Sequence, residues 1–574
     1  MGAREGVPVS EQVGWVPTRS GAVFAALHLP PAGPRGTAVV LVPPFGWEAM
    51  SSARSLRAWA RRLAEAGYPA VRFHAPGSGD SAGESTEQDL DTWSAALTDL
   101  VTHTRDATGC GRVAVVGLGL GGLAALRAVH DGCAVEDLVL WAVPAKGRLL
   151  LRELRAFAAM TTEPGDAPSA EPAAPSSPLD ADGVLWVHGY PVGTCLQDQL
   201  ARFDAETLDL GGVQRALVLG RGTLPSDGKL VGALAAAGAD VTTGPGPGYD
   251  ELTVEPRLSQ LPTEVAARVL EWLPPEAPLT EPGSWPVAAV AESQVVHGPL
   301  SVVVNRPEDP VLTVVFVGAG ATPRPGPNRL WAEAARRWAG WGVASLRLDL
   351  YGLGEADGPD AWANGPEGFY DESYRSQVRS VLDLAVREGL PARFLLVGLC
   401  SGGLWSAQTA LVDDRVVGVV VLNTNSLVWP PPLAPLSPSE RLEHLTRGST
   451  WRGLLRSPAA RVDAVRRTGR SLRLLTDRVV GPPKAGSALR SPADTAQVLR
   501  ALERAGVQVT VAVSPGEPSL PDLRRLPPDV RTRIHYLDGP IGAHTLSPSV
   551  LRAQAVEVLD EAARAALEAV VART

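Results

Sequence analysis

Short apolar runs alternate along the chain with longer stretches whose apolar positions recur at helical spacing. The runs of the first half are residues 39–42, 70–73, 113–117 and 137–141, and those of the second half are 312–318, 344–350, 394–398, 416–423, 507–513 and 533–537. Helical spacing is plain in residues 54–67 and 328–342. This alternation predicts βα units on mostly parallel, doubly wound sheets. We therefore expect α/β domains with helices on both faces of each sheet.

The second half of the chain repeats the first. A shift of 275 residues places Val40 on Val315, Arg72 on Arg347 and Gly83 on Gly358, with further identities in the same order between them. A shift of 281 overlays the glycine-rich residues 112–123 on 393–404, and a shift of 294 matches segments after residue 212. Growing offsets indicate one fold present twice, with loop insertions between its conserved parts.

Proline-rich and low-complexity stretches predict how the chain is divided. Residues 276–286 read as a linker between a domain at 1–275 and a second domain at 287–574. Residues 161–183, rich in Pro, Ser and Ala, predict a flexible insertion within the first domain. The corresponding part of the second domain, about 425–500, is longer, and we expect it to form a cap over a site.

The composition of the chain limits the kinds of partner and cofactor that we expect it to bind. With 574 residues, 45% of them hydrophobic, the chain can fill two cores. A formal charge of −9 excludes a basic field for nucleic acid. Its four cysteines are widely spaced and have no histidine at metal-ligand spacing, so we expect a cytoplasmic protein without cofactor or metal. No apolar run is long enough to span a membrane, and the oligomeric state stays open.

The segment Gly398-Leu399-Cys400-Ser401-Gly402 follows an apolar run and precedes a helical stretch. The pattern G-x-nucleophile-x-G is typical of a sharp strand-to-helix turn that exposes the central side chain. A helix N-terminus stabilises a thiolate, and the Ser401 amide would donate to an oxyanion. We interpret Cys400 as a nucleophile. The alternatives are a buried core cysteine, or Ser401 as nucleophile with Leu399 in place of the first glycine.

This turn resembles that of the α/β-hydrolase superfamily, most closely the exosortase-system-associated and serine-aminopeptidase-like hydrolases. The first-half segments VLVPPFGWEAMSSAR and GSGDSAGE and the second-half segment DLYGLGEADG also carry the resemblance, which covers nearly the whole chain. A cysteine at the turn is similar, locally, to dienelactone hydrolases and polyhydroxyalkanoate synthases. The resemblance implies two tandem α/β-hydrolase domains, and an acid and a histidine after the nucleophile.

The histidine is His544, in a loop between the run 533–537 and the last helical stretch. Glu517, just after Gly516, stands where the resemblance places the acid, and Asp477 is the alternative. Such a carboxylate would orient the imidazole and stabilise its charged form.

The small residues after the run 312–318 suggest a second oxyanion donor besides Ser401, namely Ala319 or Gly320. Asn328 and Arg329 follow nearby, and they would either contact substrate or begin a solvated helix.

The first half lacks these groups. The overlay places Gly119 on Cys400, Thr223 on Glu517 and Asp250 on His544. Pro43, which has no amide hydrogen, faces Gly318 in the oxyanion loop. We therefore expect a disarmed copy that packs on the second domain.

Cysteine, histidine and a carboxylate together perform acyl transfer. The substrate would be a small-molecule or carrier-bound acyl compound, most simply an ester or thioester that is hydrolysed. An acyltransferase or cyclase that passes the acyl group to an amine, alcohol or thiol is the alternative. A ligand-binding or scaffolding pseudoenzyme is a second alternative.

Overall fold

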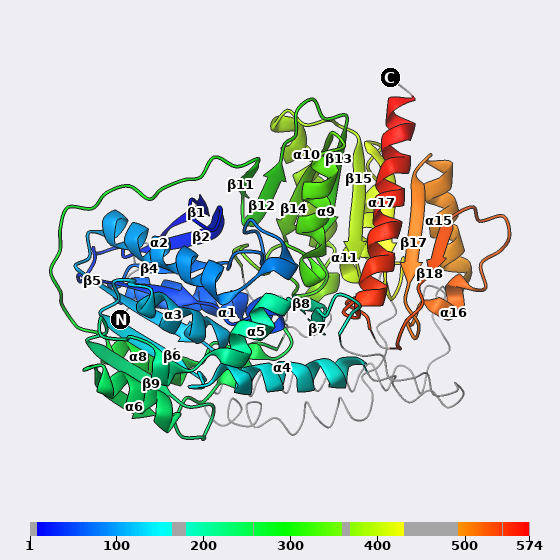
Figure 1. Cartoon of the computed structure of the whole chain (residues 1–574). Helices are drawn as coiled ribbons and strands as arrows, with labels where there is room; N and C mark the ends of the chain where they lie inside the picture. Colours follow the sequence, from blue (N-terminus) through cyan, green and yellow to red (C-terminus); the bar gives the residue numbers. More distant parts are fainter. Residues whose placement is uncertain are drawn as a thin grey trace, which may run out of the picture.

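The computed structural model describes residues 9–162, 179–256, 258–358, 368–429, 492–541 and 543–572. These residues form two eight-stranded sheets and one two-stranded hairpin (Figure 1). The predicted α/β architecture is therefore confirmed. Most of the expected cap at 425–500, and most of the insertion at 161–183, fall outside the described residues.

The first sheet has the strand order β1-β2-β4-β3-β5-β6-β9-β10. Its strands are β1 (Ser10–Val16), β2 (Val23–Leu29), β3 (Thr37–Val42), β4 (Ala70–Phe73), β5 (Arg112–Leu118), β6 (Asp137–Trp141), β9 (Arg215–Leu219) and β10 (Asp240–Gly244). Strand β2 is antiparallel to both of its neighbours, and the remaining pairs are parallel.

The second sheet has the same order, β11-β12-β14-β13-β15-β16-β17-β18. Its strands are β11 (Glu292–His297), β12 (Leu300–Asn305), β13 (Leu312–Val317), β14 (Val343–Asp349), β15 (Phe394–Leu399), β16 (Val416–Leu422), β17 (Gln508–Val513) and β18 (Arg533–Tyr536). Strand β12 is again the antiparallel one. Both sheets thus have the topology that the resemblance to α/β hydrolases implied.

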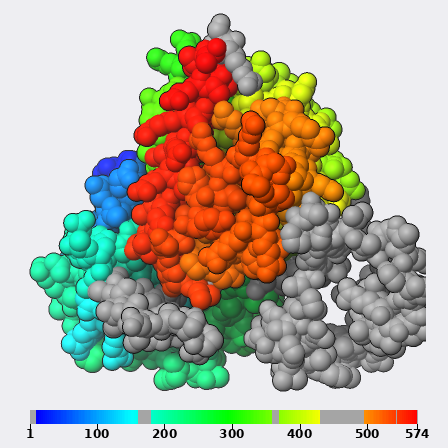
Figure 2. Space-filling view, turned by 90° about the vertical axis from the view of Figure 1, so that its right-hand side faces the viewer, coloured from blue at the N-terminus to red at the C-terminus, as the bar shows by residue number. Residues whose placement is uncertain are grey.

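Helices cover both faces of each sheet. Those of the first half are α1 (Gly46–Glu65), α2 (Leu90–Thr108), α3 (Leu120–His130), α4 (Gly147–Thr162), α5 (Thr194–Arg202), α6 (Gly228–Ala236), α7 (Tyr249–Thr253) and α8 (Thr263–Trp272). Those of the second half are α9 (Leu330–Ala339), α10 (Ser373–Arg387), α11 (Ser401–Ala410), α15 (Pro492–Arg504), α16 (Leu520–Leu523) and α17 (Ser549–Val571). Figure 2 looks onto the end of the second half, where α17 (red) lies beside the segment that contains β18 (orange).

Successive side chains of the central strands point to opposite faces of the sheet, so each half has two hydrophobic cores. Val315 and Val317 of β13 pack into one cluster, while Val314 and Phe316 pack into the cluster on the opposite face. The same alternation holds in β3 of the first half. Burial on both faces explains why these strands appear in the sequence as continuous apolar runs.

The sequence pattern missed the outer strands of both sheets, although β2 and β12 are buried almost throughout. Strands β1, β2, β11 and β12 form antiparallel hairpins at one edge of each sheet. Strand β10 is the edge strand at the other side of the first sheet, and none of its residues is fully buried. The edge strands β1, β10 and β11 need fewer apolar residues, so they leave a weaker signal.

The stretch predicted as a linker lies along the first half (Figure 1). The amide of Ala277 donates to the carbonyl of Arg35, and that of Thr280 donates to the carbonyl of Gly109. Strand β11 then begins the second sheet at Glu292.

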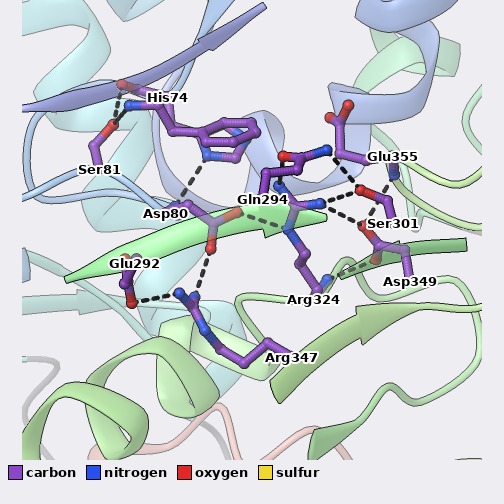
Figure 3. A network of polar contacts seen from close by, with 12 residues as sticks. His74, Asp80, Ser81, Glu292, Gln294, Ser301, Arg324, Arg347, Asp349 and Glu355 are labelled. Carbon is purple, nitrogen blue, oxygen red and sulfur yellow. Dashed lines mark hydrogen bonds and ion pairs between the residues drawn. The ribbon is translucent and has the colours of Figure 1, made fainter. Parts of the chain in front are cut away.

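Two reciprocal ion pairs join the halves. Arg72 of β4 binds Glu355. Arg347 of β14 binds Asp80 (Figure 3). The shift of 275 residues carries Arg72 onto Arg347 and Asp80 onto Glu355. Each half therefore supplies the arginine of one pair and the acid of the other. This is the contact pattern of a symmetric dimer, here within one chain.

The turns that carry the two acids are also held alike. The amide of Asp80 donates to His74 Nδ1 at 3.0 Å, and the amide of Glu355 donates to Asp349 Oδ2 at 3.0 Å. Burial lowers the pKa of His74 to about 4, so its ring is neutral and can accept this bond. Burial raises the pKa of Asp349 to about 7, although the nearby guanidinium of Arg324 opposes the shift.

Candidate active site

Cys400 lies at the turn between β15 and α11. Its backbone has φ 53° and ψ −120°, a combination that is strained for a residue with a side chain. A Cβ on Gly402 would lie 2.4 Å from the carbonyl oxygen of Val317, and one on Gly398 would lie 2.3 Å from Gly402. The two glycines are therefore required by close packing, and the turn has the geometry expected of a nucleophile elbow.

His544 meets Glu517 on one side and Cys400 on the other. Its Nδ1 lies 3.0 and 2.9 Å from the two carboxylate oxygens of Glu517, which is 5% exposed. Cys400 is also close enough to affect the charge of the imidazole, and since the carboxylate takes Nδ1, Nε2 is the nitrogen left for the thiol. The structure thus brings together the three residues that the sequence singled out. Asp477 lies outside the described residues.

The charges around His544 favour the protonated form of its imidazole. Burial alone would lower the pKa of His544, but hydrogen bonds and charge interactions with Cys400 and Glu517 outweigh it and raise the pKa to about 10. At neutral pH the ring therefore carries a positive charge beside the sulfur. A positive charge at this position can stabilise negative charge that develops on the sulfur.

Asn423, directly after β16, ties the two loops that carry Glu517 and His544. Its Nδ2 donates to the His544 carbonyl at 2.9 Å and to Ser514 Oγ at 3.0 Å, and its Oδ1 accepts the Ser514 amide at 2.8 Å. Asn423 is fully buried and has a positive φ of 41°. Its carboxamide fixes the distance between the loops.

Tyr370 is a further contact of the sulfur that the sequence analysis did not identify. Its hydroxyl hydrogen-bonds with Cys400 and with Asn425. Burial, followed by the charge of Cys400, raises its pKa well above the usual range, so the hydroxyl keeps its proton and can donate. No local pattern marks this tyrosine, because the segment before it carries neither a strand nor a helix signal.

The expected oxyanion donors differ in availability. The Ser401 amide lies in the first turn of α11, where backbone N–H groups have no partner within the helix. The Gly320 amide, in contrast, already donates to Ser401 Oγ at 3.1 Å. Ser401 and Ala319 therefore remain the predicted donors, whereas Gly320 connects the loop after β13 to the elbow.

Asn328 and Arg329 neither begin a solvated helix nor lie open to a substrate. Their exposed fractions are 5% and 4%, and both have positive φ. The helical stretch predicted for residues 328–342 is correct only over α9, Leu330–Ala339. Contacts with the first half and with the loop of His544 hold both residues outside the helix.

The first half has the same strand-to-helix turn, but another side chain fills the space beside it. Gly119 has φ 51° and ψ −120°, almost the values of Cys400. A Cβ on Gly119 would lie 2.4 Å from the hydroxyl of Tyr249, which donates to Glu48 at 2.8 Å. Asp250 pairs with Arg221 at 2.8 Å instead of facing the elbow. A tyrosine hydroxyl thus occupies the space that a nucleophile would need.

Gly119→Ala is expected to destabilise the protein by about 2–4 kcal/mol, because strain at this φ/ψ adds to displacement of the Tyr249–Glu48 hydrogen bond. Urea unfolding followed by circular dichroism measures the loss. The control is Gly132→Ala, whose site also has positive φ but has nothing within 4 Å of the added methyl group. Equal losses in the two variants would contradict the packing at Gly119.

An apolar hollow lies between the halves, away from the sulfur. About 840 Å³ in volume and partly open to solvent, it is lined by Met50 and Phe73 of the first half and by Pro325 of the second, among others. Within the described ranges, no three His, Cys, Asp or Glu side chains are arranged to hold a metal ion. In the same parts of the chain, no helix combines the length and apolar character needed to cross a bilayer.

Neither a protein-family model nor a curated protein sequence matches this chain. Solved structures do. A carboxyl esterase from Bacillus coagulans has 14% identity and a TM-score of 0.33, and the match covers 46% of this chain and 97% of the esterase. Est1E from Butyrivibrio proteoclasticus, bound to ferulic acid, has 15% identity and a TM-score of 0.31 over 45% and 96% of the two chains.

A thioesterase domain from the curacin biosynthetic pathway has 18% identity and a TM-score of 0.28, over 47% of this chain and all of that domain. Structural likeness at such identities does not establish a reaction, so function has to be sought in the residues of the site.

Proposed function

We propose that the second half is an acyl-transfer enzyme that hydrolyses an ester or thioester through an acyl-thioester on Cys400. The observation that carries the proposal is the contact of one imidazole, that of His544, with both the Cys400 thiol and the Glu517 carboxylate. Nucleophile, acid–base and orienting group are the parts that covalent acyl transfer needs.

In the first step the thiolate attacks the carbonyl carbon, and the carbonyl oxygen becomes an oxyanion. The Ser401 amide, with that of Ala319, donates to this oxygen. As the tetrahedral intermediate collapses, the His544 imidazolium gives its proton to the departing alkoxide or thiolate. The acyl group is then bound to sulfur, and the imidazole is neutral.

In the second step neutral His544 takes a proton from water, and the resulting hydroxide attacks the thioester carbonyl. The carbon–sulfur bond breaks, the acid leaves, and thiolate and imidazolium are restored. Glu517 orients Nδ1 and stabilises the positive ring in both steps. Tyr370 donates to the sulfur when it is negative, at the start and at the end of the cycle.

Intact-mass measurement tests the proposal. The protein is incubated with p-nitrophenyl butyrate and with an N-acetylcysteamine thioester, and the adduct is mapped by peptide digestion. We expect one butyryl group on Cys400 that decays in water. An adduct released only by added amine or alcohol would indicate a transferase. No Cys400 adduct with either class of substrate would end the proposal.

The pH dependence of Cys400 alkylation follows from the His544 pKa of about 10. Since the imidazolium persists up to that pH, the rate with iodoacetamide is expected to change little between pH 6 and 9. In His544→Ala, the rate should instead rise steeply with pH over this range, as it does for a thiol without a neighbouring cation. Mass spectrometry of samples quenched at successive times gives the pH profile of alkylation for the wild type and for His544→Ala. Identical profiles would contradict the thiolate–imidazolium pair.

Asn423→Ala is expected to lower kcat/KM about 10- to 100-fold, because the loops of Glu517 and His544 lose their common tie and the base shifts from its position. The matched control is Ser514→Ala. It removes one hydroxyl but keeps the bond between the Ser514 amide and Asn423 Oδ1, so we expect a decrease of less than about threefold. Steady-state hydrolysis of the p-nitrophenyl ester measures both, and equal decreases would contradict the role of the carboxamide.

A further inference from the structure

Two neighbouring residues connect the histidine loop to the first half. Asn328 Nδ2 donates to the carbonyls of Thr545 and Leu546 at 3.2 and 3.3 Å, directly after His544. Arg329 donates to three carbonyls of the first half, those of Gly79, Ser81 and Gly83, at 3.1, 2.5 and 2.8 Å. The two side chains leave the backbone toward different partners.

The backbone at this junction is held in an unfavourable conformation. Asn328 has φ 51° and Arg329 has φ 65°, so two successive residues with side chains are left-handed. Such a conformation persists only where the surroundings determine it. Here the determinants are the carbonyls of the first half on one side and the histidine loop on the other.

A hairpin of the first half covers the Asn328 carboxamide. Strands β7 (Leu185–Val187) and β8 (Tyr190–Val192) are joined by His188 and Gly189, both with positive φ, as in a tight two-residue turn. A Cβ on Gly189 would lie 2.4 Å from Asn328 Cγ and Nδ2. The backbone of the turn therefore lies flat against the carboxamide, leaving no room for a methyl group.

The turn is itself anchored in the first half. The His188 ring lies 3.9 Å from the Trp47 ring and 5.8 Å from the Phe157 ring, measured between centroids. On strand β7 of the hairpin, the Trp186 ring lies 5.8 Å from the guanidinium of Arg552, which is in the first turn of α17. The hairpin thus contacts the histidine loop through Asn328 and the helix after that loop through Arg552.

We infer that the first half, although its own elbow is filled, positions His544 of the second half: its β7–β8 hairpin and its turn at residues 79–83 fix Asn328, and Asn328 fixes the histidine loop. Asn328 and Gly189 are positioning residues, since neither touches the reacting sulfur. The inference rests on the proposed function, because it assigns these residues a role in the thiol–imidazole contact.

Gly189→Ala is the direct test. The added methyl group meets Asn328, so the carboxamide moves and the histidine loop loses its hydrogen bonds. The expected result is a decrease of about tenfold or more in Cys400 alkylation at pH 6, with less than about threefold change at pH 9. An unassisted thiol is almost fully protonated at pH 6, whereas at pH 9 it reacts without the imidazole. A merely structural loss would not depend on pH in this way.

Gly33→Ala is the matched control. Gly33 has φ 87°, as Gly189 has, lies in the same half, and has nothing within 4 Å of an added Cβ. We expect its alkylation rates to equal those of the wild type at both pH values. A background of Cys195→Ser removes the exposed competing thiol in every sample.

Asn328→Gly covers the case in which Gly189→Ala does not fold. Glycine adopts positive φ freely, so this variant removes the carboxamide without adding strain. We expect the same loss at pH 6 as in Gly189→Ala. Wild-type rates in both folded variants would overturn the inference while leaving the proposed function standing. If His544→Ala also had wild-type rates at pH 6, the proposed function would fail as well.

Discussion

Cys400→Ala is expected to lower the rate of ester hydrolysis by about 10⁴-fold or more, to the level of residual catalysis by binding and oxyanion donors alone. The reason is that the proposed covalent intermediate forms on the Cys400 sulfur, whereas the neighbouring Ser401 Oγ accepts the Gly320 amide. Initial rates with p-nitrophenyl butyrate, together with intact mass, measure the loss. The variant should unfold at nearly the same urea concentration as the wild type, because alanine relieves none of the backbone strain.

Cys195→Ser is the control for Cys400→Ala. Cys195 is exposed, and partial desolvation together with the neighbouring Asp89 carboxylate raises the pKa of its thiol, so it is a poor nucleophile. We expect wild-type hydrolysis after this substitution. Hydrolysis that survives in Cys400→Ala and disappears in Cys195→Ser would place the chemistry at the wrong thiol and refute the proposed function.

Asp80→Asn is expected to reduce the free energy of unfolding by about 3–5 kcal/mol, the usual loss when one partner of a buried ion pair is removed. Asp80 is fully buried and contacts Arg324 at 3.0 Å as well as Arg347. Asparagine fits the same space but leaves two guanidinium groups with too little negative charge. Urea unfolding of the full chain at pH 7 measures the change.

The pH dependence of this effect has a definite sign. Burial would raise the pKa of Asp80, but Arg347 and Arg324 outweigh it and hold the pKa well below its usual range. The ionised form therefore stabilises the folded state at every pH above about 4, where unfolded aspartate is also ionised. The stabilisation is lost as pH falls toward the folded-state pKa. The difference between wild type and Asp80→Asn should thus narrow below pH 4.

Asp357→Asn gives the comparison at the same interface. Asp357 binds Arg61 and Arg57, but its side chain is 59% exposed. Exposed ion pairs contribute little, so we expect a loss of less than about 1 kcal/mol. Similar losses at Asp80 and Asp357 would show that burial of the network does not matter.

The reciprocal pairs Arg72–Glu355 and Arg347–Asp80 also bear on how the chain arose. A contact in which each half gives an arginine and a carboxylate to the other is what fusion of a symmetric dimer would leave. We propose such an origin by duplication. It would also explain why the first half keeps the strained elbow at Gly119, where the backbone path is needed for packing although no nucleophile remains.

Much of the candidate site could be predicted because its features are local. Gly398 and Gly402 indicate a turn that only small residues fit. The apolar run before them predicts the strand, and the helical stretch after them predicts the helix, that this turn connects. The order of Cys400, Glu517 and His544 came from a resemblance that rests on these local segments. The alternation of apolar positions likewise determined the central strands, because burial on both faces demands it.

What only the tertiary structure decided are the contacts between segments that lie far apart in the chain. Nothing near Asn423, Tyr370 or Tyr249 in the sequence indicates that the first ties two loops, the second contacts the sulfur, or the third fills the empty elbow. Asn328 and Arg329 were even placed in a helix by their spacing. The local sequence pattern reflects backbone preference and burial. The partner of a polar side chain depends instead on which distant loops come together at the ends of the strands. That meeting depends on the packing of the whole chain.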